Sequence, residues 1–154
     1  MNLDKKLIDK IASVTSCAAA SCYKHVGKGN KEIADKAATD SMRKNLNKLN
    51  INGEVVIGEG ELDNAPMLYI GEKLGTGKGP SIDIAVDPLE GTNFAANNLP
   101  GALSVIAIAK KGNLFRAPET YMHKIATSKV EKGLIDLDYS IKKNIINLAD
   151  FKNI

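Results

Sequence analysis

The stretch from residue 81 to residue 92 reads Ser-Ile-Asp-Ile-Ala-Val-Asp-Pro-Leu-Glu-Gly-Thr, and it is the clearest guide in the chain to the kind of fold. Apolar and polar side chains alternate over residues 82–86, which predicts a β-strand. The strand is expected to end at Asp87-Pro88, because an Asp-Pro pair commonly opens a turn. A strand followed by an acidic turn is therefore expected at the centre of the domain.

Three segments have the periodicity of helices. Apolar residues recur at three- and four-residue steps over residues 4–25 and 31–49, and Asn30 is expected to cap the second of these helices. A third amphipathic helix is predicted to begin near Ser140. The positions expected to face inward in the first two helices are Leu7, Ile11, Val14, Ala18, Cys22, Ala34, Ala38, Met42, Leu46 and Leu49.

Further strands are predicted between and after these helices. They cover residues 54–57, 102–109, 121–127 and 134–137, whereas the glycine-rich residues 71–80 are expected to form a loop. Residues 102–109 are expected to form a buried strand, with Val105, Ile106 and Ile108 inside it. Two helices, several strands and a final helix predict a layered α+β or α/β domain.

The composition is that of a globular protein. The chain has 154 residues, of which 44% are apolar and 25% charged, so a disordered or collagen-like protein is excluded. No segment is apolar enough to span a membrane and the first residues lack the apolar region of a secretory signal, so a cytoplasmic location is expected. The net charge of +3 comes from scattered lysines, and only 5% of residues are aromatic, so no nucleic-acid partner is expected. Cys17 and Cys22 are expected to be buried thiols.

Two acidic turns carry the candidate chemistry. Glu59 and Glu61 follow one predicted strand, and Asp87 and Glu90 follow the next. Mg²⁺ and Mn²⁺ bind several anionic oxygens in a rigid arrangement, and strand ends supply that rigidity. Each turn alone has an ordinary structural explanation, but two of them in one short chain indicate a metal site.

The residues that follow Asp87 fit the same interpretation. Pro88 restricts the backbone beside the carboxylate, and Gly91 allows the main chain to approach a ligand. Thr92 offers a hydroxyl group that can orient an attacking water molecule.

Other catalytic motifs do not fit the sequence. There is no Gly-x-Ser-x-Gly motif, and the two histidines, His25 and His123, are expected to be surface or packing residues. The glycine-rich residues 75–79 fail as a P-loop, because no Ser or Thr follows Lys78. The sequence has no cluster of Cys and His residues, so a zinc site is not expected.

Taken together, the motifs resemble a known family. Residues 87–92 are similar to the Asp-Pro-x-Asp/Glu-Gly-Thr signature of the metal-dependent, lithium-sensitive phosphatases. Longer stretches resemble class II fructose-1,6-bisphosphatase, the bacterial type, over residues 10–145. These stretches read Val-Ile-Gly-Glu-Gly-Glu at 56–61, Ala-Pro-Met-Leu-Tyr-Ile-Gly-Glu-Lys at 65–73 and Ala-Pro-Glu-Thr-Tyr-Met at 117–122.

The resemblance implies a sugar-phosphatase-like fold in which helices pack on a mixed, largely antiparallel sheet. Residues 1–154 would form the N-terminal domain, and the C-terminal domain would be absent. The implied reaction is the hydrolysis of the 1-phosphate of fructose 1,6-bisphosphate in gluconeogenesis, with Mn²⁺ or Mg²⁺ as cofactor. The partner is then a small sugar bisphosphate, with no membrane and no nucleic acid involved.

The resemblance also assigns roles to individual residues. Lys31 would bring positive charge to the beginning of a helix, where a phosphate can bind. The implied metal ligands are Asp35, Glu59, Asp87 and Glu90. The implied substrate contacts are Glu90, Gly91, Thr92 and Tyr121, and the implied catalytic residues are Thr92, Asp63 and Lys31.

Members of this family are much longer than this chain. Their second half supplies a further metal-binding carboxylate and basic residues for the second phosphate. Three alternatives therefore stay open: an inactive fragment that needs a second-half chain, a sedoheptulose-1,7-bisphosphatase, or a relative that acts on inositol phosphate. A complete fold would be expected to form a homo-oligomer.

Overall fold

The computed structural model of the chain describes residues 4–59, 67–116 and 122–154. These residues divide into two compact units, Met1–Ala117 and Pro118–Ile154, which are described separately here. The assignment of all 154 residues to one N-terminal domain stays a prediction.

The first unit begins with a pair of packed helices, α1 (Lys5–Tyr23) and α2 (Lys31–Leu46). The side chain of Asn30 accepts a hydrogen bond from the backbone N–H of Ile33 at 3.0 Å, as the predicted N-cap should. The helices pack closely because fully buried alanines, among them Ala18, Ala34 and Ala38, lie between them. All ten predicted inward positions are buried or packed against the core, although Leu49 lies beyond the end of α2.

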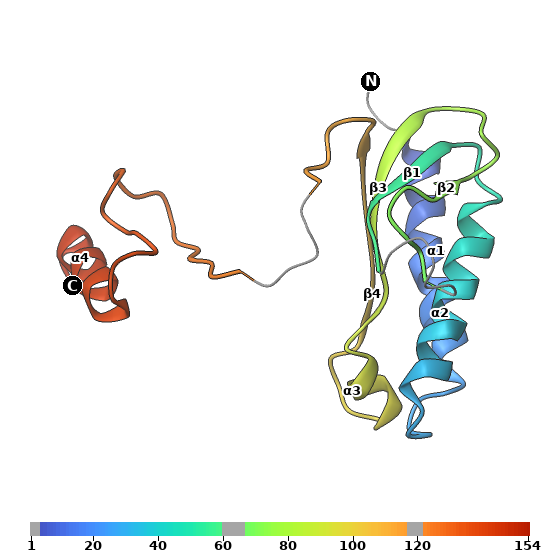
Figure 1. Cartoon of the computed structure of the whole chain (residues 1–154), viewed down its shortest axis with the longest axis horizontal. Coiled ribbons are helices and arrows are strands. Elements are labelled where there is room, and N and C mark those ends of the chain that lie inside the picture. The colour runs from blue at the N-terminus through green and yellow to red at the C-terminus, as the bar shows by residue number, and fades with distance from the viewer. Residues whose placement is uncertain (1–3, 60–66, 117–121) are drawn as a thin grey trace. The chain divides into compact units, whose positions relative to one another are not determined.

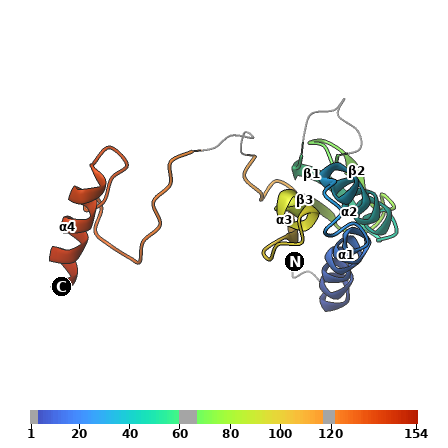
Figure 2. The ribbon, with the colours of Figure 1, turned by 90° about the horizontal axis from the view of Figure 1, so that it is seen from below.

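A four-stranded sheet supports these helices. Its strands are β1 (Asn52–Ile57), β2 (Lys73–Leu74), β3 (Ser81–Glu90) and β4 (Leu103–Lys110), in the order β2-β1-β3-β4. The pair β1–β3 is parallel, and the other two pairs are antiparallel. Figures 1 and 2 both place α1 and α2 side by side along one face of this sheet. The predicted fold, helices packed on a mixed and largely antiparallel sheet, is confirmed.

The core lies between the helices and this face of the sheet. Ile82, Ile84 and Val86 of β3 are buried there, and Ile106 and Ile108 of β4 pack against them. The opposite face of β4 is open among the described residues. Leu103 and Val105 are 60% and 43% exposed, so the prediction that Val105 is buried is wrong. The reason is that Val105 lies on the other face of β4 from Ile106 and Ile108, which pack against the core.

Strand β3 is longer than the alternation of its apolar residues indicated. It does not end at Asp87-Pro88 but continues to Glu90, with an irregularity in its pairing to β4 between Asp87 and Glu90. Pro88 cannot donate a hydrogen bond to a neighbouring strand. It is accommodated because the pairing with β1 has already ended at Ala85.

Two other details of the first unit differ from expectation. Strand β2 lies within residues 71–80, which were expected to be only a loop, and it pairs with Gly53 and Glu54 of β1. Cys22 is buried as predicted, but Cys17 is exposed, because it lies off the inward stripe of α1.

The second unit contains α4 (Ile141–Lys152), which Ser140 caps by accepting a hydrogen bond from the Lys143 N–H at 3.2 Å. The helix was predicted, but the strands at 121–127 and 134–137 were not correct for the described residues of those segments. The backbone of Asp136 instead bonds the buried side chain of Asn144, at 3.0 and 2.8 Å. These bonds satisfy the backbone N–H and carbonyl groups of Asp136, which in a β-strand would bond to a neighbouring strand.

No helix in the described ranges combines the length and apolar character required to cross a bilayer.

Candidate metal centre

Three of the predicted acidic residues, Glu59, Asp87 and Glu90, lie at one edge of the sheet, and Glu61 lies outside the described residues. Because β1 and β3 are parallel neighbours, their carboxyl ends lie at the same edge. Glu59 follows β1 by two residues, and Asp87 and Glu90 belong to the last part of β3. The motif therefore lies within a distorted strand end, and not in a turn after the strand.

A short helix closes this edge. Helix α3 (Thr92–Ala96) follows β3 directly, and its carbonyl groups accept hydrogen bonds from the turn between α1 and α2. These bonds run from the Gly27 N–H to Ala95 at 3.0 Å and from the Gly29 N–H to Ala96 at 2.8 Å. Figure 1 shows α3 beside the connection between α1 and α2, so the beginning of α2 lies at the same end of the unit.

Asp87 is the central carboxylate of the group. It is half-buried, and its Oδ1 accepts a hydrogen bond from the Leu89 N–H at 3.1 Å. Burial, followed by hydrogen bonding and charge repulsion from Glu90, raises the pKa of Asp87 to about 6, against a weaker lowering by a hydrogen bond with Glu59. Asp87 thus interacts with both Glu59 and Glu90, whereas the assignment of these residues to a metal site stays a prediction.

Asp35 lies in α2. It is half-buried, burial raises its pKa, and its Oδ1 is buried without a hydrogen-bond partner. Its charge also helps to raise the pKa of the Cys22 thiol on α1, after the larger effect of burial. A buried carboxylate oxygen without a partner is unfavourable unless something compensates it.

The donor set has the chemistry that a hard divalent cation requires. All four side chains offer carboxylate oxygens, which Mg²⁺ and Mn²⁺ prefer. A cation would also reverse the repulsion that raises the pKa of Asp87. In the described ranges, no three His, Cys, Asp or Glu side chains are arranged to hold a metal ion as they stand. The residues fit a metal, but their side chains would have to move to bind it.

The structure describes some of the other predicted site residues. Gly91 has a left-handed backbone, with φ at 78°, and caps the beginning of α3, where Thr92 is half-buried. Lys31 is exposed at the first position of α2. Asp63 and Tyr121 lie outside the described residues.

Comparison with models of known protein families identifies one family that matches this chain. The family model described as bacterial fructose-1,6-bisphosphatase, glpX-encoded, matches residues 5–154. The chain belongs to this family. The resemblance of its motifs to class II fructose-1,6-bisphosphatase is thereby confirmed.

Curated relatives agree with the family and show how much of it this chain covers. A class 2 fructose-1,6-bisphosphatase of Escherichia coli (strain K12) is 48% identical over 94% of this chain and 43% of its own length. A Synechococcus protein named D-fructose 1,6-bisphosphatase class 2/sedoheptulose 1,7-bisphosphatase is 47% identical over 96% of this chain and 44% of its own. The chain thus spans less than half the length of these family members.

Among solved structures, the extragenic suppressor from Pyrococcus furiosus aligns with a TM-score of 0.47 and 18% identity. The alignment covers 70% of this chain and 42% of that one.

Reasoning from the residues alone did not single out two of the candidate site residues, Asp35 and Lys31. Asp35 has the appearance of a surface acid in a helix, and only the family resemblance singled it out. One signal was available, because Asp35 directly follows Ala34, which belongs to the inward stripe of α2. A carboxylate beside such a position is partly withdrawn from water.

Proposed function

We propose that this chain supplies the metal-binding part of a fructose-1,6-bisphosphatase. The reaction is hydrolysis of the 1-phosphate of fructose 1,6-bisphosphate to fructose 6-phosphate and phosphate, in the cytoplasm. The observation that carries the proposal is the place of Glu59, Asp87 and Glu90 at one sheet edge, where burial, and then the neighbouring Glu90, raise the pKa of Asp87. Such a concentration of carboxylates is unfavourable without a cation and is typical of a functional site.

The metal ligands in this proposal are Asp35, Glu59, Asp87 and Glu90. When bound, Mn²⁺ or Mg²⁺ would neutralise phosphoryl oxygens and lower the pKa of a water molecule. The protein's own part would be to hold the backbone of these residues on strand ends and on α2, while their side chains move to form the site.

The remaining roles belong to residues around these ligands. Thr92, half-buried at the start of α3, would orient the attacking water through its hydroxyl group. Lys31 would attract the phosphate at the beginning of α2. Glu90, Gly91 and Tyr121 would contact the substrate, and Asp63 would assist the chemical step.

The length of the chain bears on its partners. Because the relatives are more than twice as long, we propose that activity requires the remaining part of the protein, either in the same chain or as a second-half chain. A chain without that part would be an inactive fragment. The complete protein would be a homo-oligomer.

A second substrate is favoured by one observation. The Synechococcus relative bears a name that includes sedoheptulose 1,7-bisphosphatase, and it is nearly as similar to this chain as the Escherichia coli protein. Sedoheptulose 1,7-bisphosphate is therefore the alternative substrate.

Calorimetric titration with Mn²⁺ tests the metal site. The wild-type chain should bind Mn²⁺, and Asp87→Ala should bind it at least about 10-fold more weakly, because a central ligand is lost. Asp9→Ala, which removes an exposed carboxylate from α1, is the matched control and should bind as the wild type does. Equal binding by wild type and Asp87→Ala would remove the metal site from the proposal.

A further inference from the structure

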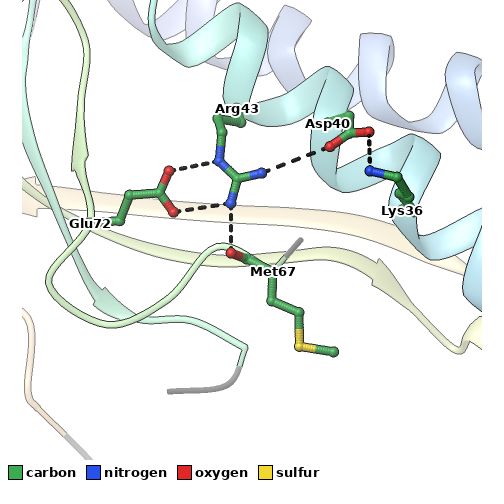
Figure 3. Close-up of polar contacts among 5 residues, drawn as sticks. All are labelled: Lys36, Asp40, Arg43, Met67 and Glu72. Atoms are coloured by element: carbon green, nitrogen blue, oxygen red, sulfur yellow. Dashed lines mark hydrogen bonds and ion pairs between the residues drawn. The ribbon is translucent and has the colours of Figure 1, made fainter. Parts of the chain in front are cut away.

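Arg43 holds the segment at residues 67–72 against α2, as Figure 3 shows. Its Nε donates to Glu72 Oε1 at 2.7 Å, and its Nη2 donates to Glu72 Oε2 at 3.2 Å. The same Nη2 donates to the carbonyl oxygen of Met67 at 2.6 Å. One guanidinium group thus binds both ends of the segment.

The contact is partly withdrawn from water. The side chain of Glu72 is 10% exposed and that of Arg43 is 26% exposed. Paired planar contacts of this kind are stronger and more directional than surface ion pairs, and a lysine cannot reproduce the fork of donors. The neighbouring pair of Lys36 and Asp40, also drawn in Figure 3, is by contrast more than half exposed.

The segment held by Arg43 in turn holds Glu59. The carbonyl of Leu68, next to Met67, accepts a hydrogen bond from the Glu59 N–H at 3.0 Å. The fit is close, because a Cβ atom at Gly58 would collide with that same carbonyl oxygen. Leu68 itself is fully buried. A shift of residues 67–68 would therefore move the backbone of Glu59.

The far end of the segment is attached to the sheet. The Val55 N–H donates to the Glu72 carbonyl at 2.9 Å, and the Gly71 N–H donates to the Val55 carbonyl at 2.8 Å. Residues 71–72 are thus held by β1 even without Arg43. Met67 has the guanidinium as an additional anchor, so the loss of Arg43 should loosen the Met67–Leu68 end most.

We propose that Arg43 is a positioning residue for the candidate metal centre: through Met67 and Leu68 it fixes the backbone of Glu59, so that this carboxylate meets Asp87. This role rests on the proposed function for its consequence, namely metal affinity. Its mechanical part, the fixing of Glu59, does not depend on the metal. Arg43 does not touch the reacting atoms.

Two measurements on the 154-residue chain with Arg43→Lys test the role. In amide hydrogen exchange without metal, the Glu59 N–H should exchange about 10-fold faster, whereas the Ile84 N–H of β3 should exchange as in the wild type. In calorimetric titration, the affinity for Mn²⁺ should fall about 10-fold, the usual effect of losing a residue that orients a metal ligand. Lys36→Ala, which breaks an exposed ion pair on the same helix, should change neither quantity.

The outcomes separate the two proposals. An unchanged exchange rate of the Glu59 N–H in Arg43→Lys would overturn the positioning role. Faster exchange spread evenly over β1 and β3 would also overturn it, because Arg43 would then stabilise the whole sheet and not Glu59 in particular. Failure of the wild type to bind Mn²⁺ would overturn the metal site, and the exchange of the Glu59 N–H would still decide the role of Arg43. If Arg43→Lys does not fold, Glu72→Gln replaces it, and the same local loosening at Glu59 is expected.

Discussion

At the scale of single residues, Asp87 carries a conflict between stability and function. Its pKa in the folded protein is about 6, whereas its ordinary value is 3.8. Between these two values the folded state binds the proton more tightly than the unfolded state does. Stability is therefore lost as the pH rises through this window, and the full penalty is present above it.

This conflict predicts that Asp87→Asn stabilises the metal-free chain. In the presence of a chelator at pH 7.5, its free energy of unfolding should exceed that of the wild type by about 1 kcal/mol, discounted for partial exposure. Near pH 4 the difference should vanish, because the wild-type carboxyl group is then protonated. Urea unfolding at the two pH values measures it, with Asp9→Asn as the control. A variant that is less stable than the wild type at pH 7.5 would show that Asp87 is held by favourable contacts instead.

At the scale of elements, the sequence predicted the helices far better than the last strands. The cap at Asn30, the start of the last helix near Ser140 and the inward stripes of α1 and α2 were correct, because helix signals are local. The strands expected at 121–127 and 134–137 were wrong, because a short apolar run becomes a strand only where another strand is available to pair with it. The same reason explains the length of β3, whose last residues are held by pairing with β4.

The candidate site shows the same difference between local signals, which a sequence carries, and long-range contacts, which it does not. Glu59, Asp87 and Glu90 were proposed from two acidic segments after predicted strands, and the parallel pairing of β1 and β3 places these strand ends at the same edge of the sheet. The role of Arg43 could not be found in this way. Its partners Met67 and Glu72 lie 24 and 29 residues away in the sequence, and no local pattern marks such a contact.

The open face of β4 predicts self-association. Leu103 and Val105 are exposed on an edge strand, and edge strands with apolar side chains readily pair with other chains. Sedimentation velocity should show larger species as the concentration rises, and Val105→Lys should reduce them. Ile33→Lys, which changes an equally exposed apolar residue on α2, is the matched control and should not. A wild-type chain that stays monomeric at every concentration would contradict this prediction.

At the scale of the whole molecule, the 154 residues should have little or no bisphosphatase activity by themselves. They match less than half the length of their relatives, and within residues 4–59, 67–116 and 122–154 the carboxylates are not arranged to hold a metal ion as they stand. Phosphoryl transfer depends almost wholly on positioning and charge neutralisation, so an incomplete set of ligands should lose most of the rate. The family resemblance places a further metal-binding carboxylate and the basic residues for the second phosphate in the part that this chain does not match.

The measurement is phosphate release from fructose 1,6-bisphosphate with Mn²⁺, by the chain alone and after mixing with the remaining part of the Escherichia coli relative. Turnover should be low for the chain alone and should rise on mixing. Thr92→Ala in the mixture should lower turnover again, because the hydroxyl group that we propose orients the water is then missing. Robust turnover by the 154 residues alone would show that the carboxylates of β1, β3 and α2 suffice for the reaction. The second half would then serve stability or specificity, because the chemistry would already be complete without it.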